Sequence, residues 1–282
     1  MESPRLLVLN ADDLGFAPGV NRGILEAHDA GTLSSASMMV NTPAFAEAIA
    51  LVGARRPRLG VGLHLNLVSG RPLTDAVSLM DARTGEFHPL GELARRAFTG
   101  RVRAEDVRRE CDAQLRALTT SGIVPTHLDS HRHAHALPGV LPAVAASAYE
   151  AGLQWVRRPL DRPSMREPVP SAKMLVLHAA WRRALLDVDP AHLPLLARAP
   201  RFRGIALQGA TDVESRLLAL LDRLPTGITE IMLHPGYDDA TLAAQDPYRH
   251  EREREVAALR APALRARLER GDIRLVNFGE LT

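Results

Sequence analysis

The chain has 282 residues, 46% of them hydrophobic, and its 35 Lys and Arg residues nearly balance 33 Asp and Glu residues. This composition is typical of a soluble globular protein. A single α/β barrel, which commonly needs about 250 residues, accounts for the length. The sequence has no concentrated basic stripe of the kind that nucleic acid binding requires. We therefore expect no nucleic acid partner.

Cysteine content and the N-terminal sequence indicate the compartment. Cys111 is the single cysteine, which excludes an intramolecular disulfide and fits a reducing environment. The N-terminus enters a strand pattern by Leu6 without a basic and apolar leader, and no window approaches 18 uninterrupted apolar residues. We expect a cytoplasmic protein without a transmembrane segment.

Strand and helix patterns alternate along the chain. Apolar runs predict strands at 6–11, 34–40, 59–67, 126–131, 153–157, 202–207, 228–234 and 273–278. Helical periodicity predicts helices at 20–30, 44–56, 103–122, 138–152, 174–186, 213–224 and 250–270. The strands are apolar throughout, which favours a parallel sheet covered by helices. The predicted fold class is α/β, with one barrel-like (β/α) domain over residues 1–282.

Two segments stand out from this alternation. Residues 158–173 are rich in proline, so we interpret them as an excursion over the rim of the barrel that could shape a substrate cleft. Residues 250–270 alternate in charge at helical spacing, which favours a solvated helix face over a binding arm.

Polar motifs follow four of the predicted strands. Asp12 and Asp13 come after the first strand, His64 lies in the third, a His-rich stretch follows the fourth, and His234 ends a later one. Because parallel strands of a barrel deliver their carboxyl ends to one rim, these residues would converge there. Aspartate and histidine together are the usual ingredients of a metal site.

Each motif also has a structural interpretation. An extended backbone would turn Asp12 and Asp13 to opposite faces, and either could simply cap the helix that follows. His64 could be a hydrogen-bonded core residue. His234 is placed like a rim residue that could act as a general acid, although a structural histidine at a strand end remains an alternative.

The fourth motif has the strongest pattern. His127, Asp129, His131, His133 and His135 are spaced by two, which would place them on one side of an extended segment. A catalytic zinc-type site needs three protein ligands, so some of these residues would have roles other than metal binding. Asp129 could accept a hydrogen bond from a ligand histidine and fix its tautomer, while His133 or His135 could face a substrate.

Together these motifs resemble the YdjC-like carbohydrate deacetylase family, which includes chitooligosaccharide deacetylases and a hopanoid-biosynthesis-associated branch. The resemblance spans nearly the whole chain and rests on motifs in register: NADDLGF at 10–16, VNRGILEAHDAGTLSSASMMVN at 20–41, VGLHLNLVSGRPL at 61–73, PTHLDSHRHAH at 125–135, MLHPG at 232–236 and RLVNFGEL at 274–281. It implies a distorted TIM-type or NodB-like barrel that holds one divalent cation. The matching ligands would be Asp13, His64 and His131, with Asp12 as the catalytic base and His234 facing the leaving group.

The activity that the resemblance implies is hydrolysis of the acetamide of an N-acetylated amino sugar. Aromatic residues make up only 4% of the chain, which favours a mono- or short oligosaccharide, or a related glycan or glycolipid headgroup, over a long polymer. Phe16, Tyr237 and the Pro-rich segment are candidate walls of the pocket, and Asn66 is a further candidate for contact with substrate or a ligand. A homodimer is a family-based expectation.

Ligand chemistry leaves the cation open. Two imidazoles favour zinc, and weaker, exchangeable binding would permit magnesium, manganese, nickel or cobalt; zinc and magnesium are the foremost candidates. The rival interpretations are a non-haem iron oxygenase, a metal-dependent hydrolase of a phosphoester or another N-acyl substrate, and a sugar- or metal-binding barrel without catalysis.

Overall fold

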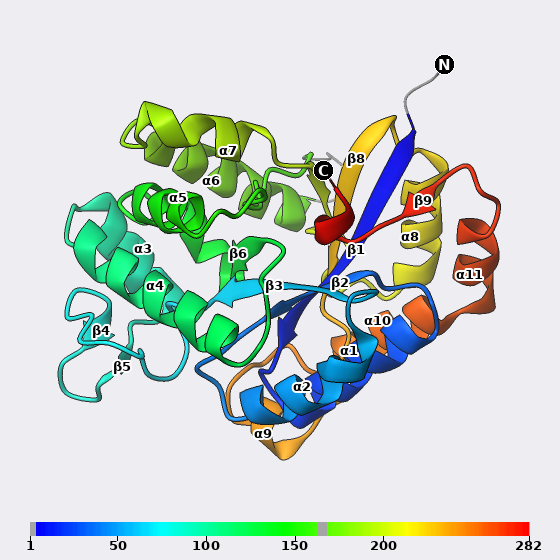
Figure 1. Ribbon diagram of the computed structural model, residues 1–282, viewed down its shortest axis with the longest axis horizontal. Coiled ribbons are helices and arrows are strands. Elements are labelled where there is room, and N and C mark those ends of the chain that lie inside the picture. The colour runs from blue at the N-terminus through cyan, green and yellow to red at the C-terminus, as the bar shows by residue number, and fades with distance from the viewer. Residues whose placement is uncertain (1–3, 163–167, 282) are drawn as a thin grey trace. The chain divides into compact units, whose positions relative to one another are not determined.

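The computed structural model describes residues 4–162 and 168–281, and their packing forms two compact units. The first unit contains the described residues up to Met38, Pro43–Val61, and the described residues from Pro200 onward. The second contains Met39–Thr42 and Gly62–Ala199. Most strands are parallel and helices surround them, so the predicted α/β class is confirmed (Figure 1). That all 282 residues form one domain stays a prediction.

Strand β1 (Arg5–Leu14) is central to the sheet of the first unit. It pairs in parallel with β8 (Gly227–Leu233), with β2 (Ser35–Met38) and with the short β9 (Arg274–Leu275). Strand β7 (Arg201–Arg203) extends the sheet beyond β8, and the first residue of β3 (Gly60–Leu65) hydrogen-bonds to Ser34 just before β2. The two long strands β1 and β8 are buried over most of their length, and their largely apolar sequences are what a covered parallel sheet requires.

The helices of the first unit pack against one another. They are α1 (Pro18–Asp29), α2 (Phe45–Val52), η1 (Gly53–Arg55), α8 (Val213–Asp222), α9 (Ala240–Ala243), α10 (His250–Arg260), α11 (Pro262–Leu268) and η4 (Phe278–Glu280). Helix α10 contacts α1, α8 and α11 (Figure 1). Because α10 packs against helices on several sides, part of its charged sequence lies inside the protein.

The segment 250–270 presents a solvated face, as predicted, but packing buries some of its charges. Arg252 and Glu255 are each only 1% exposed, and the segment is two helices separated at Ala261. Alternating charge at helical spacing identifies the helix, but it does not reveal which charges are buried.

Glycines in α1 allow the loop after β8 to approach closely. A Cβ atom at Gly23 would lie 2.6 Å from the Cα of Gly236 and 2.9 Å from Cγ2 of Val256. A Cβ at Gly19 would overlap the carbonyl oxygen of Tyr237. The absence of side chains at these two positions therefore sets the distance between α1 and the segment that begins at His234.

We expect Gly23→Ala to destabilise the protein, although alanine is the better helix former. The methyl group meets backbone at Gly236, and overpacking of this kind costs about 1–3 kcal/mol, more than the about 1 kcal/mol that Ala gains over Gly in a helix. Urea denaturation measures the change, and Gly91→Ala in α3 (Leu90–Phe98), where no atom lies within 4 Å of the added Cβ, is the control. Equal or greater stability of Gly23→Ala would contradict the close approach.

The second unit contains the end of β3 and strand β6 (Leu128–Ser130), which pair in parallel. A short antiparallel pair, β4 (Met80–Asp81) and β5 (Glu86–Phe87), lies apart from them in the topology. The helices are α3, α4 (Ala104–Thr120), η2 (His131–Ala136), α5 (Leu141–Glu150), α6 (Pro168–Leu185), η3 (Pro190–His192) and α7 (Leu193–Ala197). Cys111 is buried in α4, and burial raises the pKa of its thiol to about 12, as expected for a structural cysteine.

Several predicted elements differ from the structure. The strand expected at 153–157 is reduced to one bridge between Val156 and Leu128, and those expected at 202–207 and 273–278 are short. Residues 168–173 of the predicted Pro-rich excursion begin α6, because proline is tolerated in the first helical turn. Residues 163–167 of that excursion lie outside the described residues. Within the described ranges, no helix combines the length and apolarity that crossing a membrane requires.

Candidate functional site

An irregularity at the end of β1 gives its two aspartates separate environments. The register between β1 and β2 shifts between Ala11 and Leu14, and Asp13 has a φ of 73°, in the left-handed region. Bulges of this kind re-aim side chains and are common beside active sites. The capping alternative is excluded, because the N-cap of α1 is Ala17 and no side chain caps it.

Asp12 lies beside His234. Strand β8 pairs with β1 up to Ala11 and Leu233, so the next residue of each strand is brought close. The Nε2 atom of His234 is 4.0 Å from Oδ2 of Asp12. Asn10 Nδ2 donates to Oδ1 of Asp12 at 3.0 Å, which orients the carboxylate. A carboxylate and an imidazole at this separation can serve as a base and an acid on one bound molecule.

Asp13 faces a buried cation. Its Oδ2 accepts a hydrogen bond from Nη2 of Arg252 at 2.7 Å, and the same nitrogen donates to Oδ2 of Asp246 at 3.1 Å. Asp13 and Arg252 are each 1% exposed. The guanidinium thus balances part of the negative charge that the two carboxylates would otherwise bury unpaired.

Glu255 links His234 to the start of α10. The backbone N–H of His234 donates to Oε2 of Glu255, and the Tyr248 hydroxyl donates to Oε1 at 2.6 Å. The Tyr248 ring also lies edge-on to the His234 imidazole, with centroids 5.8 Å apart. Burial raises the pKa of Glu255 to about 7, although the hydrogen bonds from Tyr248 and His234 and the charge of Arg252 oppose the rise.

In the second unit, His64 belongs to a buried series of charged contacts. Strand pairing places His64 opposite Asp129, and Nδ1 of His64 is 2.7 Å from Oδ1 of Asp129. The other oxygen of Asp129 lies 2.5 Å from Nη2 of Arg157. Burial would raise the pKa of Asp129, but the charges of Arg157 and His64 outweigh it and lower the pKa below its ordinary value. The carboxylate stays ionised and holds the Nδ1 proton of His64.

The histidine motif does not form the predicted extended segment. Strand β6 ends at Ser130, and His131–Ala136 is a 3₁₀ segment in which Arg132 and His133 have φ values of 53° and 56°. The chain therefore bends, and a spacing of two no longer places the histidines on one side. The prediction of a shared side was wrong.

The bend separates the histidines by environment. His131 lies near His64, with ring centroids 5.6 Å apart, and His133 is 4% exposed. His135 is fully buried, with Nδ1 2.5 Å from the Ser130 hydroxyl and Nε2 2.9 Å from the Arg157 carbonyl oxygen. Burial lowers the pKa of His135 to about 4 and that of His127 to about 3, so both rings are neutral near pH 7.

The remaining predicted residues have contacts within their own units. Asn66 donates to Asn41 and to the Ser69 carbonyl, and its side-chain oxygen accepts from two backbone N–H groups. The Tyr237 hydroxyl donates to Glu26 at 2.6 Å. Phe16 is fully buried, which argues against contact of its ring with substrate. The proposed wall roles of Phe16 and Tyr237 stay predictions.

Sequence reasoning missed two arginines. Arg157 directly follows Val156 at the end of a predicted strand, and the strand-end rule that identified His64 and His234 could have identified it. Arg252 lies in the charged segment at 250–270, where no pattern distinguishes a buried arginine from a solvated one.

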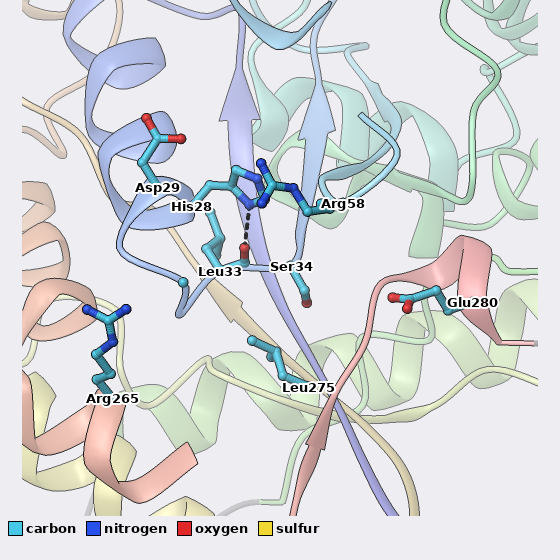
Figure 2. A pocket seen from close by; sticks show the side chains of 9 residues that line it. His28, Asp29, Leu33, Ser34, Arg58, Arg265, Leu275 and Glu280 are labelled. Atoms are coloured by element: carbon cyan, nitrogen blue, oxygen red, sulfur yellow. Dashed lines mark hydrogen bonds between the residues drawn. The ribbon is translucent and has the colours of Figure 1, made fainter. Parts of the chain in front are cut away.

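A pocket of about 480 Å³ in the first unit is lined by none of the predicted site residues. Its walls include His28 and Asp29 at the end of α1, Ser34 before β2, and Glu280 (Figure 2). Figure 2 shows the hydrogen bond of His28 Nδ1 with the Leu33 carbonyl, 2.7 Å long. Since Ser34 precedes β2, this pocket lies toward the amino ends of the strands, whereas Asp12 and His234 lie at the carboxyl ends.

Comparison with known proteins identifies the family. The model of the family described as YdjC-like protein matches residues 6–270. The chain belongs to this family. A carbohydrate deacetylase of Geobacillus stearothermophilus is 37% identical over 98% of each chain, and a chitooligosaccharide deacetylase of Serratia marcescens is 33% identical over 98% of this chain and 99% of that one. The predicted resemblance to YdjC-like proteins is confirmed.

A solved structure shares the fold of this YdjC-like chain. The protein, from Enterococcus faecalis V583 and provisionally named for cellobiose-phosphate cleavage, matches 99% of this chain and 100% of its own, with a TM-score of 0.76 and 26% identity. The curated relatives are named as deacetylases, which are hydrolytic enzymes, while this structural relative is named for another reaction.

The buried residues of this YdjC-like chain have the chemistry to bind a metal ion. Asp12, Asp13, His64, Asp129 and His131 are all buried and offer carboxylate or imidazole donors. Two of them are already oriented: Asp129 fixes the Nδ1 proton of His64, so a metal would bind that ring through Nε2, and Arg252 fixes one oxygen of Asp13. Ligands held in this way by buried partners are typical of metal sites.

Proposed function

We propose that the protein is a metal-dependent N-deacetylase of amino sugars, which hydrolyses the acetamide to acetate and a free amine. The observation that carries the proposal is the pair of Asp12 and His234, 4.0 Å apart at the ends of adjacent strands. The names of the curated relatives support the substrate class. Amide hydrolysis needs both a base for water and an acid for the departing nitrogen, and this pair offers the two groups.

In this proposal, Asp13, His64 and His131 hold one divalent ion. Their donor types suit zinc, and a more exchangeable magnesium, manganese, nickel or cobalt ion would also be accepted. When bound, such an ion polarises a carbonyl and lowers the pKa of coordinated water to about 7. Asp12 is left outside the ligand set, so its carboxylate remains available for proton transfer.

Asp12 and His234 then divide the proton transfers. Asp12 accepts the proton of the attacking water, and Asn10 holds the carboxylate that receives it. His234, anchored at its backbone by Glu255, delivers a proton to the departing amine, since an unprotonated amide nitrogen leaves poorly. Because both residues directly follow the last residue pair of β1 and β8, their separation is set by the sheet and not by a flexible loop.

The substrate is proposed to be small. Aromatic residues, on which sugar rings often stack, make up only 4% of the chain, and this favours a mono- or short oligosaccharide. Cytoplasmic location and a homodimer stay predictions.

Acetate release tests the proposal. Chelator-stripped protein is assayed with N-acetylglucosamine, its short oligosaccharides and their phosphorylated forms, with and without added divalent ions. The phosphorylated sugars are included because a structural relative is named for cleavage of a phosphorylated disaccharide. Metal-dependent acetate release supports the proposal. Release of phosphate or cleavage between the sugars would favour another hydrolase, and binding without turnover on metal-loaded protein would favour a sugar-binding barrel.

Removal of the metal is expected to lower both activity and stability. We expect kcat/KM to fall by about two orders of magnitude or more, because the positive charge opposite the developing oxyanion is lost. Metal at 100 times its Kd should raise the free energy of unfolding by about 2.7 kcal/mol over the stripped protein. Acetate assays and urea denaturation measure the two effects. Full activity of protein shown to be free of metal would contradict the proposal.

A further inference from the structure

Two buried arginines face the acidic residues of the candidate site. Among the described residues, Arg157 and Arg252 are the two largest side chains that are fully buried, and each is 2% exposed or less. Arg252 bonds Asp13, and Arg157 bonds Asp129, which in turn bonds His64. Each arginine therefore leads to a proposed metal ligand through one or two charged contacts.

Stability alone does not account for these arginines. Burying an ion pair costs several kcal/mol of solvation per ion, and apolar residues of similar volume often stabilise a protein equally well. Within the described residues, Nη1 of Arg252 has no hydrogen-bond partner, which adds to the cost of burying it. Costs of this kind are tolerated where a charged group has a functional task.

The contacts of Arg252 are suited to fixing a ligand. Its Nε donates to the Tyr248 carbonyl at 2.9 Å, and its Nη2 donates to Asp13 and Asp246, so the guanidinium is fixed from two sides. Asp13, held by it, has the left-handed φ of 73°, a conformation that persists in a non-glycine residue when its surroundings impose it. The direction of the Asp13 carboxylate is thus set by Arg252 together with the strained backbone.

Arg157 acts on His64 through Asp129. It fixes one oxygen of Asp129 at 2.5 Å, and the other oxygen of Asp129 then holds His64 Nδ1 at 2.7 Å. Without Arg157, the carboxylate would be a buried, partly unpaired charge and would lose its fixed orientation. His64 would then lose the bond that selects its tautomer.

We propose that Arg157 and Arg252 are positioning residues of the metal centre, which fix the ligands His64 and Asp13 for a divalent ion. The inference rests on the proposed function for the identity of the ligands, but it concerns metal affinity and not the substrate. Loss of a residue that orients a metal ligand costs about 10- to 100-fold in metal affinity.

The chain provides a matched control in Arg267. This arginine is also buried, at 5% exposed, and bonds Asp222 at 2.7 Å and Asp272 at 2.8 and 3.1 Å. It lies in α11, and its hydrogen bonds go to Asp222, Asp272 and the Leu221 carbonyl, none of which belongs to the proposed site. Arg267→Lys therefore reproduces the loss of a buried guanidinium without touching the site.

The test measures metal binding by Arg252→Lys, Arg157→Lys and Arg267→Lys. Lysine keeps the charge but not the planar fork that bonds several partners at once, so the variants should fold. Titration calorimetry with Zn²⁺ and with Co²⁺ on stripped protein gives Kd, and the visible spectrum of the cobalt-loaded protein reports ligand geometry. We expect Kd to rise at least about tenfold for the first two variants and to stay within about threefold for Arg267→Lys.

The possible results separate the inference from the proposed function. Wild-type affinity and an unchanged cobalt spectrum in both site variants would overturn the inference, as would an equal loss of affinity in Arg267→Lys. If the site variants lose affinity while the wild-type protein deacetylates no sugar, the positioning role stands and the proposed function fails. Asp13→Asn is measured in parallel, and unchanged metal affinity in it would show that the ligand assignment itself is wrong and so would overturn the inference too.

Discussion

Asp12→Asn is expected to lower kcat by about 10²- to 10⁴-fold, the usual contribution of a general base, while the protein still folds and binds metal. The asparagine cannot accept the water's proton, but it is the same size as aspartate and can keep the hydrogen bond from Asn10. The effect should appear in kcat at saturating metal, measured by acetate release, because the proton transfer is made only in the transition state.

Asp13→Asn is the matched comparison, since the two aspartates are adjacent and both buried. This variant removes a proposed ligand and one of the two carboxylates that pair with Arg252, so metal affinity and stability should fall together. Activity should then depend on added metal at far higher concentration than in the wild type. Loss of metal from Asp12→Asn, or retained activity within tenfold, would refute this division of labour.

The positions of the site residues in the sheet were predictable. Apolar runs identified β1, β3, β6 and β8, and a polar residue at the carboxyl end of each run predicted where chemistry would lie. Strand pairing then accounts for the Asp12 and His234 contact and for the His64 and Asp129 bond, which the sequence had suggested as a way to fix a histidine tautomer. These contacts follow from register, which is regular in parallel strands.

What the sequence could not show depends on local departures from regular geometry. A spacing of two predicts one shared side only if the strand continues, and β6 ends at Ser130 because Arg132 and His133 adopt left-handed conformations. Neither arginine nor histidine indicates a left-handed conformation in the sequence, as a glycine would. The histidines after the bend are therefore separated, with His135 bonded to Ser130 and Arg157 in the interior.

The burial of Arg252 and Glu255 was equally hidden. Their segment has the composition of a solvated helix, and only tertiary packing of α10 against α1 and α8 turns these two charges inward. Each then finds a partner whose identity is set by distant segments, Asp13 for the arginine and the His234 backbone for the glutamate. Long-range pairing of this kind leaves no periodic trace in a single sequence.

The metal-free protein is expected to lose stability as the pH falls from 6.5 to 4.5. His127 and His135 have pKa values of about 3 and about 4 in the folded protein, below the ordinary 6.5, so the unfolded chain binds two protons that the native state does not. Glu255 acts in the opposite direction, because its raised pKa of about 7 makes the native state bind a proton that the unfolded chain does not. For these three groups the net difference is about one proton near pH 5, so their contribution to the free energy of unfolding should fall there by about 1.4 kcal/mol per pH unit.

Two variants separate the opposing contributions. Glu255→Gln removes the group whose protonation stabilises the folded state. The unfolded chain then binds two more protons than the native state, and the slope should rise to about 2.7 kcal/mol per pH unit. His135→Gln can keep bonds to Ser130 and to the Arg157 carbonyl without titrating, and its slope should fall to about zero in this range. Urea denaturation at several pH values gives each slope. Parallel slopes in the three proteins would mean that these buried groups do not titrate as their environments dictate, and that the acid response arises elsewhere in the chain.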